Sequence, residues 1–280
     1  MQKQITIKSQ IFESKCPELY SEMLSLKRLK NNSMALQEEF ELQGNFLFRY
    51  RGILPLAILL LTIVAYILHI AALPENGKNV IDDFYHYLCL LITLLGFGIR
   101  IYTVGYTPDN TSGRNTKEQI ADELNITGIY SIVRHPLYVG NFFMWSGIAL
   151  LSQNIWFILA FIFMYWVYYE RIMFAEEQFL RKKFGEVYLS WAQQTPAFIP
   201  QLTKFKKTST KFNIRKVIKQ EKTGFLLTFL LYFLFYEIGL CITMKKISIK
   251  FNFWFYAMIF SLVAYILIKL LEKKYSHEPE

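Results

Sequence analysis

The chain has 280 residues, of which 53% are hydrophobic, and a formal net charge of +9 at pH 7. This hydrophobic fraction, with 25 Phe and 18 Tyr, argues against an ordinary soluble domain. Cys16, Cys89 and Cys241 are too few and too scattered for a disulfide framework or a zinc site, and we expect no metal site. No recognisable nucleic-acid-binding module accompanies the positive charge, so we expect no nucleic-acid partner.

The N-terminal part of the chain differs sharply in composition from the segment after it. Residues 1–50 are polar and charged and show no signal-peptide architecture. Residues 52–73 then carry no charged side chain over 22 positions, which is enough for a helix to cross a hydrocarbon core of about 30 Å. The sequence therefore predicts an integral membrane protein.

Further apolar segments come later in the chain. A second span is predicted over 84–104, and the loop after it is expected to contain a short helix over Lys117–Leu124. As a helix, residues 138–151 would reach only about 21 Å, which is too short to span a membrane. We expect them to form a tight helical hairpin with residues 155–174.

The last two spans are predicted at about 224–243 and 253–271. The predicted fold is therefore all-α, a polytopic integral membrane helical bundle with about six membrane segments, including the short hairpin. The predicted parts are an N-terminal lead-in (1–50), a membrane core with a pocket (51–200), a basic linker (201–223) and an accessory C-terminal hairpin (224–280).

Lys and Arg are distributed unevenly between the two sides of the predicted bundle. One side holds eight in 1–51, three in 105–137 and eleven in 175–223, whereas the other holds one in 74–82, none in 151–154 and three in 244–250. Because positively charged loops stay in the cytoplasm, we expect both termini, both long loops and the pocket to be cytoplasmic. The basic run from Lys204 to Lys222 is expected to rest on anionic lipid headgroups.

Residues 128–140 place an Arg-His pair, Arg134 and His135, at the start of the short apolar segment. Polar groups beside the bilayer must find partners, so such a pair indicates a functional site. Pro136 fits the first turn of a helix. The amides of residues 137–139 would then be unpaired donors that point toward a bound anion. The segment predicts a cationic, donor-rich pocket at the membrane surface.

Two adjacent glutamates come after the predicted hairpin. Glu177 has Arg181 four residues later, so we expect a surface ion pair between them. Glu176 has apolar side chains at its i±3 and i±4 positions and needs a counter-charge from another element or from a ligand. Arg171 is a further candidate, as an anchor for an anionic substrate, although snorkelling to headgroups explains it equally well. The candidate catalytic residues are therefore Arg134, Arg171 and Glu176.

The Arg-His-Pro-x-Tyr-x-Gly block at 134–140 and the Glu-Glu…Phe-Gly…Tyr…Pro…Ile-Pro block at 176–200 stand in a characteristic order and separation. Together they resemble the isoprenylcysteine carboxyl methyltransferase and phospholipid methyltransferase superfamily, over roughly residues 90–200. The resemblance implies an S-adenosylmethionine-dependent methyltransferase, with a cytoplasm-facing cofactor pocket and a lipid or lipidated acceptor. By position it also implies that the cofactor is bound by Asn115, Asp122, Glu123, Leu124, Asn125, Tyr130, His135, Pro136, Leu137, Tyr138 and Glu176.

One position departs from the family pattern. Eukaryotic members have a substrate-binding arginine where this chain has Ile172, and Arg171 is one residue away. The acceptor stays open between a carboxylate, a lipid phosphate and a phospholipid amine. A carboxylate or phosphate is already ionised at pH 7 and needs no general base, so His135 is expected to contact the cofactor instead.

Two other classes of protein fit parts of the sequence. Membrane sterol-type reductases that use NADPH look similar around the His-Pro block, but they do not typically carry the paired glutamates at this spacing. A transporter or membrane scaffold would also have six spans and basic loops. Transporter sites usually lie at the bilayer midplane, whereas the polar residues here concentrate at one surface. The oligomeric state does not follow from the sequence.

Overall fold

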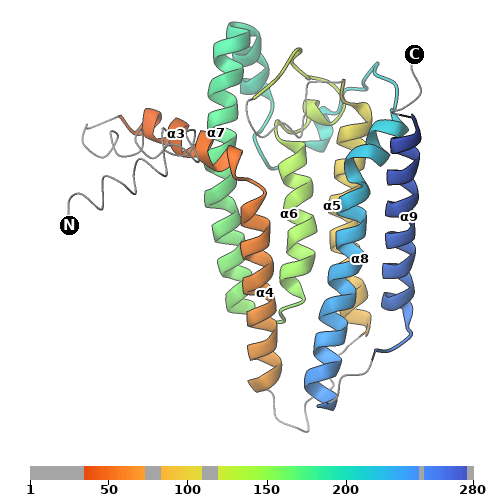
Figure 1. Cartoon of the computed structure of the whole chain (residues 1–280). Coiled ribbons are helices and arrows are strands. Elements are labelled where there is room, and N and C mark those ends of the chain that lie inside the picture. Colours follow the sequence, from red (N-terminus) through yellow and green to blue (C-terminus); the bar gives the residue numbers. More distant parts are fainter. Residues whose placement is uncertain (1–34, 73–82, 109–118, 246–248, 276–280) are drawn as a thin grey trace, which may run out of the picture.

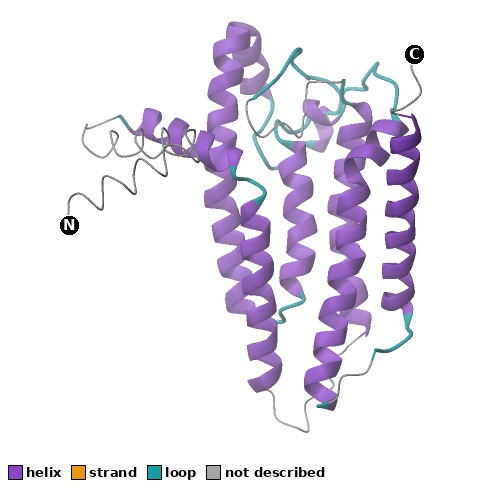
Figure 2. Ribbon diagram, viewed as in Figure 1, coloured by secondary structure: helices purple, strands orange, loops and turns teal. Residues whose placement is uncertain are grey.

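The computed structural model describes residues 35–72, 83–108, 119–245 and 249–275. Their α-helices are α3 Leu36–Arg49, α4 Ile53–Ala72, α5 Asp83–Tyr106, α6 Pro136–Leu150, α7 Ile155–Gln194, α8 Ile214–Met244 and α9 Phe253–Tyr275, with single 3-10 turns η2 Ile129–Ser131 and η3 Leu202–Lys204. Helices α4 to α9 stand side by side in a bundle, and α3 lies across it (Figure 1). The loops that contain residues 119–135 and 195–213 gather at one end of the bundle (Figure 2), which we call the loop end.

The described helices confirm the predicted polytopic bundle. Five of them, α4, α5, α7, α8 and α9, are long and apolar enough to cross a membrane. Helix α6 has 15 residues and spans about 22 Å, so it is too short to do so alone. It forms the predicted hairpin with α7. The side chain of Asn154 caps α7 by accepting a hydrogen bond from the amide of Phe157 at 3.0 Å.

Helices α5 and α6 approach each other closely because glycines line their contact. A Cβ on Gly96 would meet the carbonyl oxygen of Gly140 and the amide nitrogen of Met144, and one on Gly147 would meet Thr93. Small residues of this kind let helix backbones pack tightly in lipid, where the hydrophobic effect does not drive helices together. The close packing fixes the start of α6 against α5.

Helix α7 continues past the predicted span as far as Gln194, and it carries a kink at Gly185, whose φ is +53°. Such a backbone conformation favours glycine. Helix α3 packs on this extension. A Cβ on Gly44 would clash with the carbonyl of Arg171, and Lys182 forms an ion pair with Glu41 at 2.5 Å. The lead-in is thus joined to the helix that carries the paired glutamates.

One detail of the predicted secondary structure is wrong. Residues 119–124 of the predicted helix over Lys117–Leu124 are not helical, and residues 117–118 lie outside the described residues. A helix this short is marginal by itself, and here the chain runs along a cavity at the loop end. Helix α8 contains the predicted span over 224–243 and extends beyond it to begin at Ile214, where the side chain of Asn213 accepts a hydrogen bond from the amide of Lys216 at 3.0 Å.

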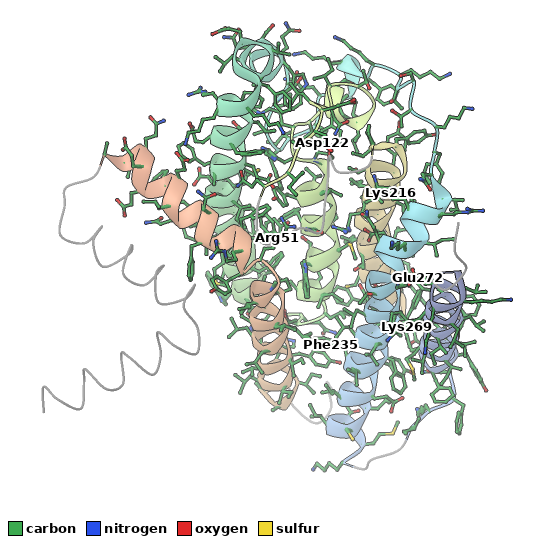
Figure 3. The ribbon with its side chains drawn as sticks, turned by 45° about the horizontal axis from the view of Figure 1, so that its top comes forward. Arg51, Asp122, Lys216, Phe235, Lys269 and Glu272 are labelled. Atoms are coloured by element: carbon green, nitrogen blue, oxygen red, sulfur yellow. The ribbon has the colours of Figure 1, made fainter. Side chains whose placement is uncertain are left out.

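Part of the basic run that was expected to rest on lipid headgroups points into the protein. Lys216, labelled in Figure 3, is buried and donates from Nζ to the carbonyls of Thr107 at 2.7 Å and Pro108 at 2.9 Å. These two residues come directly after α5, so the lysine joins that end of α5 to α8. Lys222 contacts Glu272 of α9 at 2.5 Å. These two lysines stabilise helix packing.

Candidate active site

A cavity of about 670 Å³ opens between the helices at the loop end. Binding sites for small molecules commonly enclose about 300–1,000 Å³. The sequence candidates that line it are Glu123, Leu124, Asn125, Tyr130, Arg134, His135, Pro136, Leu137, Tyr138 and Glu176. The fold therefore brings together residues from three separate segments of the chain, and their roles remain predictions.

Three candidates are placed differently. Asp122 lies in the loop at the loop end (Figure 3) but does not line the cavity. Arg171 also lies outside the cavity lining, with its guanidinium 3.4 Å from the ring centroid of Phe40 in α3 and 3.4 Å from the carboxylate of Glu170. Asn115 lies outside the described residues. The structure therefore gives Arg171 a contact with α3 rather than a place at the cavity.

His135 lies between the two glutamates of α7. Its Nδ1 is 3.3 Å from Oε2 of Glu176, and its Nε2 is 3.0 Å from Oε1 of Glu177. Nη2 of Arg134 also contacts Oε1 of Glu177, at 3.0 Å. Because a carboxylate only accepts hydrogen bonds, both ring nitrogens of His135 must donate to satisfy these contacts. The geometry favours the protonated imidazolium.

The pKa of His135 follows from the same contacts. Burial, the largest influence, lowers the pKa because it disfavours the charged ring. The hydrogen bonds and the Coulombic attraction of Glu176 and Glu177 act in the opposite direction and prevail, so the pKa is raised above its ordinary value. The two glutamates therefore favour the protonated form of the ring at the N-terminus of α6.

Glu176 is the glutamate that faces the cavity. Its Oε1 accepts a hydrogen bond from the Tyr138 hydroxyl at 2.6 Å, and the Tyr138 ring stacks on that of His135 with centroids 5.7 Å apart. The counter-charge that Glu176 was expected to need is supplied by His135 from another element. Its side chain keeps 25% of its surface exposed, so a ligand in the cavity can reach it.

The predicted surface ion pair between Glu177 and Arg181 is wrong. Glu177 instead contacts Arg134 and His135, and it does not line the cavity. Tertiary structure decides the partner of Glu177, because the segment after α7 folds back along the Arg-His pair. The amide of Arg134 donates to the carbonyl of Pro196 at 2.9 Å, and that of His135 donates to Ala197 at 3.2 Å. These bonds carry the pair onto the face of α7 that holds Glu177.

The amides at the start of α6 are less available than predicted. Those of Tyr138 and Val139 both donate to the carbonyl of His135, at 3.1 and 3.2 Å. His135 is the N-cap residue, and its carbonyl lies over the first turn. The donor-rich character of the pocket therefore rests on side chains more than on these two amides.

Several cavity residues were missed by sequence reasoning. They are Arg51, Arg100, Asn141, Tyr169 and Glu221, from five different parts of the chain. Figure 3 shows Arg51 at the junction of α3 and α4, where its guanidinium lies 4.1 Å from the ring centroid of Phe48. Arg100 had a usable signal, because an arginine inside an apolar run of this length indicates a buried polar partner.

The fold and the cavity define a multi-pass membrane protein with a pocket of polar and apolar side chains at one end of its bundle. Residues 84–187 match the family model described as phospholipid methyltransferase. The resemblance to the isoprenylcysteine carboxyl methyltransferase and phospholipid methyltransferase superfamily is thereby confirmed over this segment. Comparison with solved structures gives no match.

Curated relatives match stretches of 115 to 138 residues of the chain. The nickel-cobalt-cadmium resistance protein NccN of Alcaligenes xylosoxydans xylosoxydans is 32% identical over 122 residues, 43% of this chain and 54% of that protein. The protein-S-isoprenylcysteine O-methyltransferase of Schizosaccharomyces pombe is 30% identical over 138 residues, 49% of this chain and 58% of that protein. The enzyme of the same name from Saccharomyces cerevisiae is 32% identical over 115 residues, 40% of this chain and 47% of that protein. The chain spans about half the length of these relatives.

Proposed function

We propose that the protein is an integral membrane methyltransferase that transfers a methyl group from S-adenosylmethionine to a lipid-linked carboxylate or lipid phosphate. One observation carries the proposal. His135 and Tyr138 from the first sequence block meet Glu176 from the second on the wall of one cavity, inside the segment that matches the phospholipid methyltransferase model. The relatives named protein-S-isoprenylcysteine O-methyltransferase support a carboxylate acceptor.

The residues of the cavity fit S-adenosylmethionine. Glu176 is a partly exposed carboxylate on the cavity wall and would hold the ammonium group of the cofactor. Tyr130 and Tyr138 supply aromatic surface for its adenosine. When bound, the cofactor supplies an electrophilic methyl group.

The side chains around the Arg-His pair orient the reacting groups and exclude water, and they do not take up a proton. With both ring nitrogens donating to glutamates, His135 has no free lone pair to act as a base. An ionised acceptor needs none, so orientation and desolvation carry the rate enhancement. Arg134 contacts Glu177 and donates from Nη1 to the carbonyl of Ala192 at 2.8 Å, which makes it a positioning residue.

Cofactor binding is the direct test. Isothermal titration of the purified protein in detergent is expected to show one S-adenosylmethionine site and no NADPH site. Glu170→Gln is a suitable control because Glu170 lies outside the cavity lining, and it should bind the cofactor as the wild type does. Binding of NADPH in place of S-adenosylmethionine would favour the reductase class. Binding of neither would favour a transporter or scaffold.

We further propose that the loop end, and with it the cavity, faces the cytoplasm. The excess of Lys and Arg in the segments at that end supports this orientation. In spheroplasts, a cysteine introduced as Lys206→Cys should react with a membrane-impermeant maleimide only after the membrane is opened. Labelling before the spheroplast membrane is opened would place the cavity on the outer side.

A further inference from the structure

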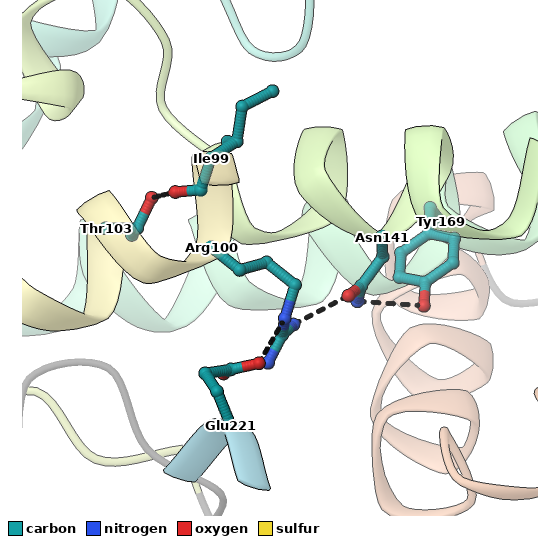
Figure 4. Close-up of polar contacts among 6 residues, drawn as sticks. All are labelled: Ile99, Arg100, Thr103, Asn141, Tyr169 and Glu221. Atoms are coloured by element: carbon teal, nitrogen blue, oxygen red, sulfur yellow. Dashed lines mark hydrogen bonds and ion pairs between the residues drawn. The ribbon is translucent and has the colours of Figure 1, made fainter. Parts of the chain in front are cut away.

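A chain of polar side chains crosses the bundle beside the cavity (Figure 4). Arg100 of α5 donates from Nε to Oε2 of Glu221 at 3.1 Å and from Nη2 to Oε1 at 2.6 Å. Its Nη1 donates to Oδ1 of Asn141 in α6 at 2.6 Å. The amide of Asn141 in turn donates to the hydroxyl of Tyr169 in α7 at 3.5 Å. This series of hydrogen bonds therefore joins four helices, three of which meet at the guanidinium.

The partner that fixes this guanidinium lies outside the segment that matches the family model. Glu221 belongs to α8, whereas the matched segment ends at residue 187. Two α8 positions near Glu221, Gly224 and Leu227, also line the cavity. Helix α8, which the sequence presented as part of an accessory hairpin, is thus a wall of the pocket and the support of Arg100.

Both members of this ion pair line the cavity, and the cation is more exposed than the anion. The Glu221 side chain is 5% exposed and both its oxygens accept from Arg100, whereas the Arg100 side chain is 19% exposed. A guanidinium carries five N–H donors. The bonds to Glu221 and Asn141 use three of these donors, so two remain for a group in the cavity.

Part of the lining contributed by the helices that hold Arg100 and its partners is apolar. It consists of Met144, Trp145, Ile148, Leu227 and Leu231, from α6 and α8. In such surroundings water competes weakly, so a charge-assisted hydrogen bond is stronger than at a wet surface. The site therefore combines an anion-binding group with room for an apolar chain.

We propose that Arg100, held in place by Glu221 and Asn141, binds the anionic group of the acceptor amphiphile. The shared chemistry is a carboxylate or phosphate attached to an apolar chain, and the guanidinium fork recognises either. An ammonium acceptor meets a like charge at this position. The assignment rests on the proposed function only in taking the bound amphiphile as the methyl acceptor.

The test uses four amphiphiles that share one apolar chain: dodecanoate, dodecyl phosphate, dodecanol and dodecylammonium. Binding to the full-length protein in uncharged detergent is measured by native mass spectrometry without cofactor. We expect at least one anionic amphiphile to bind about tenfold more tightly than dodecanol. The tighter of the two anions identifies the acceptor group. Equal binding of all four, or a preference for dodecylammonium, overturns the proposal.

Variants assign the preference to Arg100. In Arg100→Gln the preference for the anion over dodecanol should disappear, and Arg100→Lys should retain part of it. Removal of the cation alone leaves Glu221 buried without its partner, so the double variant Arg100→Gln/Glu221→Gln keeps an uncharged amide pair if the single variant does not fold. The matched control is Lys222→Gln, which removes a neighbouring cation that contacts Glu272 and does not line the cavity. It should keep the full preference.

Two readouts separate this proposal from the proposed function. Calorimetry with S-adenosylmethionine reports the cofactor part of the pocket, and the four amphiphiles report Arg100. A wild type that selects anions but binds no S-adenosylmethionine refutes the methyltransferase and leaves the anion site standing. A wild type that binds the cofactor but does not select anions refutes only the role of Arg100. An anion preference that survives in the double variant also refutes that role.

Discussion

The same substitution at the two neighbouring glutamates of α7 should affect different properties of the protein, stability at Glu177 and cofactor affinity at Glu176. Glu176 faces the cavity, and Glu177 fixes Arg134 and His135 behind it. Glu177→Gln removes an ion pair and a charge-assisted hydrogen bond, and hydrogen bonds to charged groups contribute about 1.5–3 kcal/mol each. Because a chain of this size loses about 2–4 °C in Tm for each kcal/mol, we expect the loss of one such hydrogen bond to lower the Tm by roughly 3–12 °C.

Glu176→Gln should instead affect binding. The amide oxygen can still accept from the Tyr138 hydroxyl, and the contact with His135 that is weakened is the longer of the two, at 3.3 Å against 3.0 Å. The Tm should therefore fall less than in Glu177→Gln. The loss of the carboxylate removes a charge-assisted hydrogen bond to the cofactor, which weakens its binding about tenfold or more. In Glu177→Gln the cavity lining stays intact, and affinity should remain within about tenfold of the wild type and above that of Glu176→Gln.

Both quantities can be measured on one preparation in detergent. Thermal unfolding is followed with a thiol-reactive dye, since Cys89 is buried in the folded protein and becomes reactive when the helices separate. Cofactor affinity is measured by calorimetry below the lowest Tm of the set. If Glu177→Gln lowers the affinity more than Glu176→Gln, or leaves the Tm unchanged, the assignment of the two helix faces is refuted.

Three further predictions concern pH, helix packing and Arg171. Because the pKa of His135 is raised in the folded protein, its contribution to stability is complete below its unfolded pKa of about 6.5 and is lost as the pH rises through the folded pKa. The Tm should fall over this range in the wild type and fall less in His135→Gln; identical pH profiles would contradict the imidazolium. Gly96→Ala should lower the free energy of unfolding by about 1–3 kcal/mol because its Cβ meets the backbone of α6, whereas Gly98→Ala, with open space around its Cβ, should be neutral or stabilising in the same thermal assay. Arg171→Ala removes the contact with Phe40 and should lower the Tm while the cofactor dissociation constant stays within a few fold, and a large loss of affinity would return Arg171 to the site.

The sequence alone was sufficient for features that depend on contiguous residues. The length of an uncharged run decides whether a helix can cross a membrane, so the five long spans and the short α6 could be predicted from residue counts. Pro136 likewise predicted the start of α6, because a proline fits the first helical turn wherever the helix lies. The meeting of the two sequence blocks was predicted only through a family resemblance.

The partners of the charged residues were decided by tertiary structure. Helical spacing offers Glu177 a neighbour at Arg181, but a partly buried contact with both Arg134 and His135 outcompetes an exposed pair that gains at most about 1 kcal/mol. That contact exists only because the segment after α7 folds back and bonds to the backbone of Arg134 and His135.

The ion pair between Arg100 and Glu221 could not be predicted from local sequence either. The sequence shows that Arg100 needs a partner, yet the partner, Glu221, is 121 residues away on a helix outside the recognised segment. Local periodicity describes which residues share a face of one helix, and it contains no information about which face of another helix packs against it. That choice is made by the close packing of α5 on α6 through Gly96 and by the packing of α8 against α5, so it could be found only in the folded structure.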